Sequence, residues 1–229
     1  FMKNKNIVIV GANSEIAKKL IEMLEIQNKV YKVTSNKDLI NRDNENSLYF
    51  STYEDFSTID NVLDKIKDID IAIIFNGKLT SFKNSDFEKK KELININFVY
   101  PSSIISKIIN KNKNKNLQIA AISSVAGDRG RHKNIIYSSS KAALTSFLSS
   151  MRQRYSNYKI TTVKLGMVKT NMTKDLDLPP FLADKPEDAA NLIYNGILSK
   201  KDIIISFKWS IIMFIVKILP EKIFKKFKF

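Results

Sequence analysis

The chain has 229 residues, 44% of them hydrophobic, and a formal net charge of +15. This length and composition fit one folded domain and exclude a disordered or low-complexity protein. Without cysteine there are no disulfides or thiolate metal sites, and the single histidine, His132, makes a histidine metal site or a Ser-His-Asp triad improbable. We therefore expect no metal. The basic charge comes mainly from lysine mixed with Asn and Ile, and without a nucleic-acid-binding motif we expect no nucleic acid partner.

Short apolar runs alternate with amphipathic stretches of helical length. The runs are Ile7–Val10, Val30–Val33, Leu48–Phe50, Ile71–Phe75, Leu117–Ile122, Ile160–Leu165 and Ile203–Ile205. The helix candidates lie near residues 14–27, 55–67, 86–112, 135–156 and 186–199. Several runs lack alternating polar residues, as in strands covered on both faces. We predict an α/β fold in which a doubly wound parallel sheet of about seven strands carries helices on both faces. The predicted domain spans residues 1–206, and a basic, aromatic extension follows at 207–229. No signal peptide precedes the first strand, so we expect a cytoplasmic protein.

Gly11 directly follows the first predicted strand, and a helix is predicted to start near Ser14. In a doubly wound sheet this turn holds a dinucleotide pyrophosphate, because glycine allows close approach and the helix N-terminus supplies free N–H groups. Only the first of the three expected glycines is present; Glu15 and Ala17 occupy the other two positions. Glu15 is tolerable if its side chain points to solvent. A simple strand-to-helix turn is the alternative. The candidate cofactor-binding residues here are Gly11, Asn13, Ser14, Glu15 and Ile16.

The tip of the second strand reads VTSNKD. An acidic residue at this point binds the adenine ribose of NAD, whereas a basic group favours the 2'-phosphate of NADP. Here the tip has no acid and is followed by Ser35, Asn36 and Lys37. This favours NADP(H) over NAD(H).

Ser124, Tyr137 and Lys141 form the candidate catalytic group. Tyr137 and Lys141 are four residues apart and share one face of the predicted helix. Ser124 ends the apolar strand before it, at the edge where parallel sheets place ligands. A nearby ammonium lowers the pKa of a phenol, so Lys141 is expected to make Tyr137 a better acid–base group. Ser124 would hydrogen-bond a ketone oxygen as negative charge develops there.

The spacing of these three residues resembles the short-chain dehydrogenase/reductase family, which implies a Rossmann-type fold over about residues 5–206. Asn76-Gly77 resembles the family's turn after strand four, and Asn97 its helix asparagine, which holds a water linked to the lysine. VKLGMVKT resembles the stretch in which the backbone of Val168 and the side chain of Thr170 contact the nicotinamide. Three positions depart from the family pattern. They are Glu15, Leu165 in place of a proline, and Ser51-Thr52 in place of an adenine-contacting acid.

The stretch SSVAGDRGR and the tryptophan-containing basic C-terminus resemble reductases of decaprenylphosphoryl-2-keto-ribose. This implies a keto-sugar or a polyprenyl-phosphate-linked sugar in cell-envelope polysaccharide synthesis as substrate. Arg129 and Arg131 near Ser124 suit a phosphate, since guanidinium groups bind phosphate bidentately. Solvated loop charge is the alternative. Phe181, in the lid predicted between Asn171 and Pro186, is a candidate substrate contact.

The C-terminal extension is apolar, aromatic and basic. Residues 209–219 are expected to pack over the site or in a subunit interface. Residues 220–229, with lysines around Ile223, Phe224 and Phe227, are expected to contact an anionic membrane surface, which would make the protein peripheral at the inner face of the membrane. The family resemblance also implies a homodimer or homotetramer through the helices near 97–112 and 135–156.

Two other functions fit the sequence. The first is a reductase of 3-oxoacyl carrier protein, whose acidic carrier would suit the basic surface. The second is a cofactor-binding scaffold without turnover.

Overall fold

The computed structural model describes residues 2–35, 46–53, 55–80, 86–112, 116–177 and 179–226. Seven strands form one sheet in the order β3-β2-β1-β4-β5-β6-β7, and every pairing is parallel. The strands are β1 (Asn6–Val10), β2 (Lys29–Thr34), β3 (Ser47–Tyr49), β4 (Ile71–Ile74), β5 (Gln118–Ser124), β6 (Lys159–Leu165) and β7 (Ile203–Ile204). The predicted doubly wound parallel sheet is confirmed.

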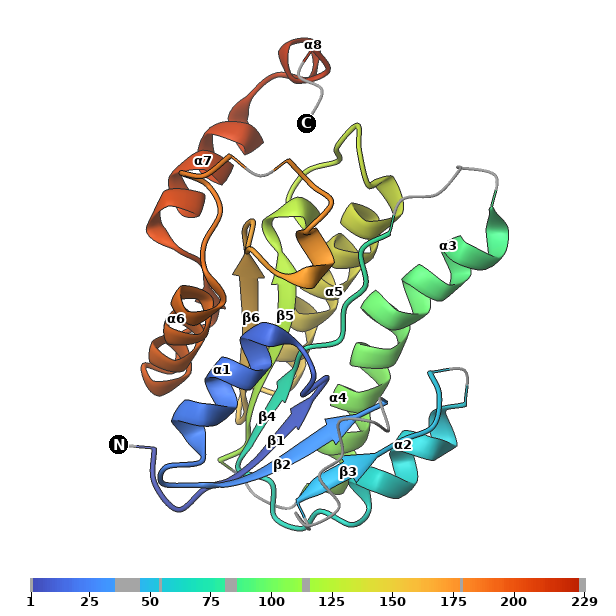
Figure 1. Ribbon diagram of the computed structural model, residues 1–229, viewed down its shortest axis with the longest axis vertical. Helices are drawn as coiled ribbons and strands as arrows, with labels where there is room; N and C mark the ends of the chain where they lie inside the picture. Colours follow the sequence, from blue (N-terminus) through green and yellow to red (C-terminus); the bar gives the residue numbers. More distant parts are fainter. Residues whose placement is uncertain are drawn as a thin grey trace.

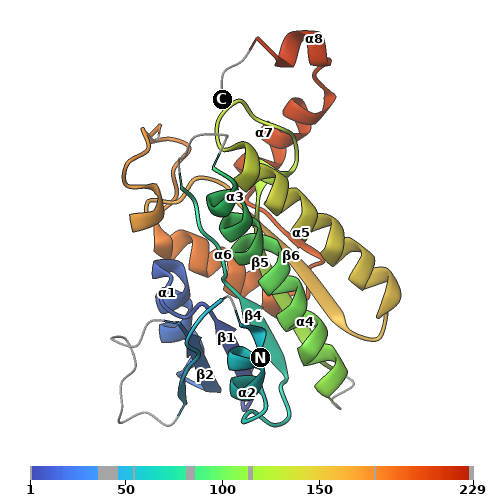
Figure 2. The ribbon, with the colours of Figure 1, turned by 90° about the vertical axis from the view of Figure 1, so that its right-hand side faces the viewer.

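Helices cover both faces of this sheet (Figures 1 and 2). They are α1 (Glu15–Leu24), α2 (Phe56–Leu63), α3 (Phe87–Ile94), α4 (Tyr100–Lys111), α5 (Ile135–Arg154), α6 (Pro186–Leu198), α7 (Phe207–Ile218) and α8 (Glu221–Phe224). The buried side chains of α1 and α6 pack on one face, and those of α2, α4 and α5 pack on the other.

The apolar strand runs follow from this double covering. Successive side chains of a strand point to opposite faces, so a strand buried on both sides needs apolar residues at every position. In β1, Ile7 and Ile9 join the core under α1 and α6, whereas Val8 and Val10 join the core under α2, α4 and α5. All four of these side chains are fully buried.

The strand order reverses direction between β1 and β4. In such sheets ligands bind at the carboxyl ends of the strands, beside this reversal. The turns after β1, β4, β5 and β6 meet at that edge, and α7 and α8 lie beyond it (Figure 1).

The helix predicted near 86–112 is interrupted. A π-helical turn, Asn95–Val99, separates α3 from α4, and the N–H of Tyr100 donates to the carbonyl of Asn95, five residues back. Pro101 contributes to this interruption because it has no N–H to donate to the carbonyl of Asn97, four residues earlier. Such π turns occur frequently at functional sites.

Candidate active site

A cavity of about 850 Å³ lies at the carboxyl edge of the sheet. One end is formed by the turn after β1 and the tip of β2, including Gly11 and Ser35. The other end is formed by Ser124, Tyr137 and Trp209. The volume lies within the range usual for small-molecule and cofactor sites.

The three predicted catalytic residues come together at this second end. Ser124 is the last residue of β5, whereas Tyr137 and Lys141 lie in the first two turns of α5. The hydroxyl of Ser124 hydrogen-bonds the side chain of Tyr137. Ser124 Oγ also lies 3.2 Å from the carbonyl oxygen of Leu165 and accepts a hydrogen bond from the N–H of Ala126. All three residues line the cavity.

Burial raises the pKa of Tyr137 above its ordinary value. The hydrogen bond from Ser124 and the charge of Arg131 act in the opposite direction and lower this pKa, but by less than burial raises it. Tyr137 is therefore a protonated phenol near neutral pH. A protonated phenol beside an open cavity can donate a proton to a ligand oxygen.

Lys141 lies near Tyr137 but is not among the groups that shift the pKa of that phenol. Its Nζ donates to the carbonyls of Ile122 (2.9 Å) and Asn76 (3.3 Å) and lies 5.9 Å from the centre of the Tyr137 ring. Burial lowers the pKa of Lys141 to about 7, so its charge is weakened near neutral pH. The cation that lowers the pKa of Tyr137 in the structure is Arg131 instead.

Asn97 lies behind the cavity rather than in its wall. The side chain is fully buried in the π-helical turn, and both of its polar atoms bind the backbone of Lys78. This fixes the segment after β4 against α3 and α4. A Cβ added to Gly77 would lie 3.3 Å from Lys141 Nζ and 3.7 Å from Asn97 Oδ1, so Gly77 packs beside both side chains.

The turn after β1 has the features expected of a pyrophosphate site. Gly11 has a φ of +80°, which favours glycine, and an added Cβ would lie 3.1 Å from the backbone of Phe75. Ser14 makes no side-chain cap to α1, so the helix N-terminus keeps its N–H groups available. Gly11, Asn13, Ser14, Glu15 and Ile16 all line the cavity.

The side chain of Glu15 is half-exposed, and it also makes a contact that the sequence did not predict. Its carboxylate accepts a hydrogen bond of 2.6 Å from the N–H of Asn171, in the segment after β6. Glu15 therefore connects the start of α1 to that segment across the cavity wall.

The wall after β3 and β4 contains a residue that sequence reasoning missed. Tyr53 lines the cavity, and its hydroxyl hydrogen-bonds Ser35 and accepts from Asn76 Nδ2 at 2.9 Å. The other side-chain atom of Asn76, Oδ1, is buried and has no partner within the described structure. Asn36 and Lys37, the residues on which the NADP prediction partly rests, lie outside the described residues.

The segment after β6 covers part of the cavity, as predicted. Val168 forms a bridge with Asp184, and a short 3-10 turn, Asn171–Thr173, follows Thr170. Val168 and Thr170 both line the cavity, together with Met172 and Leu176. Phe181 does not line it. The N–H groups of Leu182 and Ala183 bond back to the carbonyl of Pro179, and this turn leaves Phe181 78% exposed.

The two arginines after β5 have different positions. Arg131 lines the cavity beside Tyr137, as predicted for a substrate contact. Arg129 does not. Its guanidinium donates to the carbonyls of Val216 and Leu219, pairs with Glu221 at 2.8 Å, and lies 3.9 Å from the centre of the Phe224 ring. The prediction of Arg129 as part of a phosphate clamp is therefore wrong, because its donors hold the end of α7.

The C-terminal extension packs on the site through α7. Trp209 and Met213 are buried against Val125, and Trp209 lines the cavity next to Gly166. This agrees with the prediction for residues 209–219. Of the apolar residues predicted to face a membrane from the last segment, Phe224 is instead buried beneath Arg129, and Phe227 lies outside the described residues.

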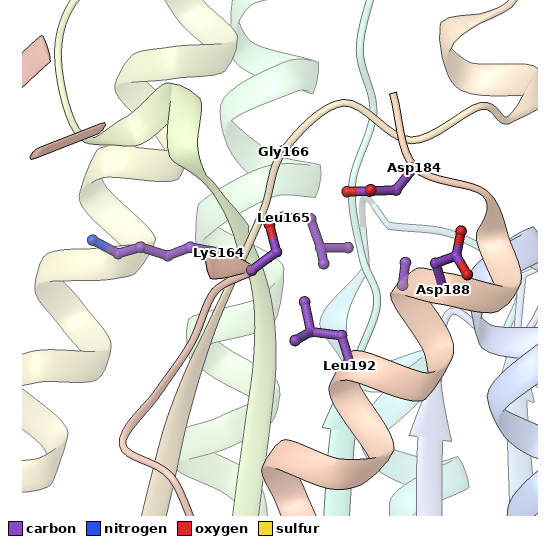
Figure 3. A pocket seen from close by; sticks show the side chains of 8 residues that line it. Lys164, Leu165, Gly166, Asp184, Asp188 and Leu192 are labelled. Carbon is purple, nitrogen blue, oxygen red and sulfur yellow. The ribbon is translucent and has the colours of Figure 1, made fainter. Parts of the chain in front are cut away.

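A smaller cavity of about 180 Å³ lies behind Gly166, between the end of β6 and the start of α6. Figure 3 shows Asp184 and Asp188 close together beside it, with Leu192 below them on α6 and Lys164 extending away. Asp184 is paired with Lys208 at 2.6 Å. The volume is below the usual range for ligand sites, so we assign this space a structural role.

A nicotinamide dinucleotide fits the residues of the larger cavity. Gly11 with its positive φ and the uncapped start of α1 line the cofactor end of this cavity. Asn76 also lines the cavity, and its buried Oδ1 has no partner among the described residues. The hydroxyls of Ser124 and Tyr137 stand at the other end, where a nicotinamide and a second ligand would meet.

Comparison with known proteins agrees with this geometry. The model of the short chain dehydrogenase family matches residues 3–179. The chain belongs to this family. It therefore falls among NAD(P)-dependent oxidoreductases, as the Ser124, Tyr137 and Lys141 spacing indicated.

Among sequences, an uncharacterized oxidoreductase of Myxococcus xanthus is 29% identical over 163 residues, which is 69% of this chain and 64% of that protein. A 3-oxoacyl-(acyl-carrier-protein) reductase of Buchnera aphidicola is 28% identical over 77% of this chain and 79% of its own length. Among structures, a short chain dehydrogenase of Burkholderia cenocepacia in complex with NADP has a TM-score of 0.78 at 14% identity, covering 96% of this chain and 99% of its own. At this identity, the structural likeness shows the fold alone.

Proposed function

We propose that the protein is an NAD(P)H-dependent ketoreductase in which Tyr137 gives the proton to the ketone oxygen. The observation that supports this most directly is the meeting of Ser124, Tyr137 and Lys141 at one end of a cavity whose other end suits a dinucleotide. Reduction of a ketone adds a hydride to its carbon and a proton to its oxygen. The nicotinamide cofactor, when bound, supplies the hydride.

The chain's own residues supply the rest of the reaction. Ser124 donates a hydrogen bond to the ketone oxygen and stabilises the negative charge that develops there. Tyr137 then transfers its phenolic proton to that oxygen, and the charge of Arg131 together with the Ser124 hydroxyl stabilises the phenolate left behind. Lys141, held by the carbonyls of Ile122 and Asn76, fixes the wall between β4 and α5 and contributes positive charge when it is protonated.

For the substrate, we propose a keto-sugar, either free or linked to a polyprenyl phosphate. Arg131 and Lys133 line the cavity and bring positive charge to its mouth, which suits a phosphate group. Met172 and Leu176 bring apolar surface to the same cavity, which suits a lipid portion. We also propose NADP(H) as the preferred cofactor, because the described tip of β2 ends in Thr34 and Ser35 without an acid.

The test measures the oxidation of the nicotinamide cofactor, by its absorbance, with each ketone of a substrate panel. Purified protein is mixed with NADPH or NADH and one ketone at a time: a keto-sugar, its phosphorylated form, and a 3-oxoacyl thioester. Reduction of the phosphorylated keto-sugar, with a KM that rises in Arg131→Ala more than in the neighbouring Lys133→Ala, supports the proposal. A KM that Arg131→Ala leaves unchanged contradicts the phosphate contact.

The similarity to acyl-carrier-protein reductases favours a second candidate, reduction of 3-oxoacyl thioesters. The net charge of +15 would suit an acidic carrier protein. Preferential turnover of the thioester in the same panel selects this candidate. If NADPH binds in calorimetry and no ketone is reduced, a non-catalytic scaffold is the better description.

A further inference from the structure

Helix α7 has two apolar faces, and only one of them is covered. Trp209 and Met213 face the active site and are buried. On the opposite side, large apolar residues are spaced as one helical face. They are Phe207, Ile211, Phe214, Ile215 and Ile218, and their side chains are 82%, 47%, 66%, 50% and 63% exposed, respectively. We call these five residues the α7 stripe. A contiguous apolar patch of this kind marks an interaction surface.

Basic side chains lie at the C-terminal end of the stripe. Lys222, Lys225 and Lys226 are exposed, and within the described structure none of them pairs with an acid. Among the described acids near these lysines, Glu221 is paired with Arg129, and Asp128 is paired with Lys164 and Lys217. In Figure 1, α7 and α8 lie beyond the carboxyl edge of the sheet.

We propose that the α7 stripe and the three lysines bind the surface of an anionic lipid bilayer, with α7 lying in the plane of the interface. The chemistry matches that of interfacial helices, in which an apolar face enters the acyl boundary and lysines contact acidic headgroups. In the described part of the chain, no helix has the length and apolarity needed to cross a membrane. The 12 residues of α7 are about 18 Å long, well short of the roughly 30 Å apolar core.

Charge favours lipid over a second copy of the chain as the occupant. A two-fold contact through the stripe would bring two sets of the same three lysines towards each other, in a protein whose net charge is already +15. Like charges held close together oppose such a contact. An anionic headgroup region neutralises the same lysines.

The location of the stripe also bears on substrate entry, and this part rests on the proposed function. Trp209 lines the cavity from the inner face of α7, and Met172 and Leu176 line it from the segment after β6 while remaining 46% and 42% exposed. Leu182 of that segment packs against the Trp209 cluster. The cavity is thus separated from the bilayer-facing stripe by one helix. A lipid-linked keto-sugar could reach Tyr137 without leaving the membrane surface.

The test is vesicle flotation with the full chain. Vesicles of phosphatidylglycerol and phosphatidylcholine in equal parts are compared with phosphatidylcholine alone. The double variant Phe214→Ser/Ile218→Ser should bind the anionic vesicles at least about tenfold more weakly than wild type, because two exposed apolar side chains are lost. The matched control Ile26→Ser/Phe87→Ser removes apolar side chains elsewhere in the chain that are slightly more exposed, at 77% and 70% against 66% and 63%, and should bind as wild type does.

The lysines are tested separately. Replacing Lys222, Lys225 and Lys226 with Gln should weaken binding to the anionic vesicles by roughly a hundredfold and leave any binding to neutral vesicles unchanged. The control replaces the exposed Lys65, Lys67 and Lys200 with Gln and should change binding much less.

Three results would overturn the proposal. The first is that the wild-type protein floats with neither kind of vesicle, and the second is that the double variant floats as wild type does. The third is that, without lipid, the wild-type protein is a dimer and the double variant is a monomer. Circular dichroism establishes that each variant is folded. Turnover of a water-soluble ketone distinguishes membrane binding from ketoreductase activity. If the double variant loses flotation but keeps wild-type turnover, the α7 stripe binds membrane and has no part in catalysis. If the wild-type protein itself shows no turnover, only the ketoreductase proposal is rejected.

Discussion

Gly166 has no room for a side chain, and this makes Gly166→Ala a sensitive test of how α7 packs on the site. An added Cβ would lie 1.8 Å from Nε1 of Trp209 and 2.1 Å from its Cε2. The first distance is about 1.5 Å or more inside ordinary van der Waals contact. The indole is rigid and only 3% exposed, so it cannot turn aside without moving α7.

The expected cost is that of overpacking a core, about 1–3 kcal/mol. For a chain of this size, this corresponds to a melting temperature lowered by roughly 2–12 °C. Since Trp209 also lines the cavity, we expect the affinity for substrate to fall as well.

Fluorescence measures this displacement directly because Trp209 is the only tryptophan in the chain. Gly166→Ala should shift the emission of the folded protein to longer wavelength as the indole gains contact with water. The matched control is Gly130→Ala, where an added Cβ meets no atom within 4 Å and the emission should not change. If Gly166→Ala has the emission and melting temperature of wild type, Trp209 does not pack on Gly166 and the placement of α7 is wrong.

Two further predictions concern charged side chains. Because burial lowers the pKa of Lys141 from 10.5 to about 7, the unfolded chain binds more protons than the folded one between these values, and stability should rise with pH across that range. Lys141→Met should flatten this rise in urea unfolding measured from about pH 7 to 10, and a variant with the wild-type slope would contradict the buried position of the ammonium. Arg129→Ala should remove roughly 3–4 kcal/mol of local stability at the end of α7, from two charge-assisted hydrogen bonds and the contact with Phe224. Hydrogen exchange of α7 amides should then be at least about a hundredfold faster, whereas the exposed control Arg154→Ala should leave it unchanged; equal exchange in both variants would show that Arg129 does not hold the helix.

The sheet and its helices were predictable because the local pattern determines them. A strand buried on two faces requires an unbroken apolar run, and each of the seven runs became a strand of the sheet. The Ser124, Tyr137 and Lys141 group was predictable for a similar reason, since a strand end and one helical turn fix their relative positions.

The features that were missed depend on contacts between distant parts of the chain. Arg129 binds carbonyls 87 and 90 residues further along, and nothing in the local sequence distinguishes it from Arg131, which lines the cavity. Trp209 and Tyr53 reach the cavity only once α7 and β3 are packed. The interruption of the helix near residue 97 did have a local signal, because Pro101 cannot donate to the carbonyl four residues before it. The burial that lowers the pKa of Lys141 also required the folded structure.

The central claim is that the hydroxyl of Tyr137 donates the proton in ketone reduction, and Tyr137→Phe tests it most directly. The measurement is the NADPH-dependent rate at which the best ketone from the substrate panel is reduced. The matched control is Tyr155→Phe, because Tyr155 lies at the far end of α5. Removing a general acid should lower kcat by about 10²–10⁴-fold while NADPH still binds, and the control should keep the wild-type rate. Full reductase activity in Tyr137→Phe would contradict the mechanism.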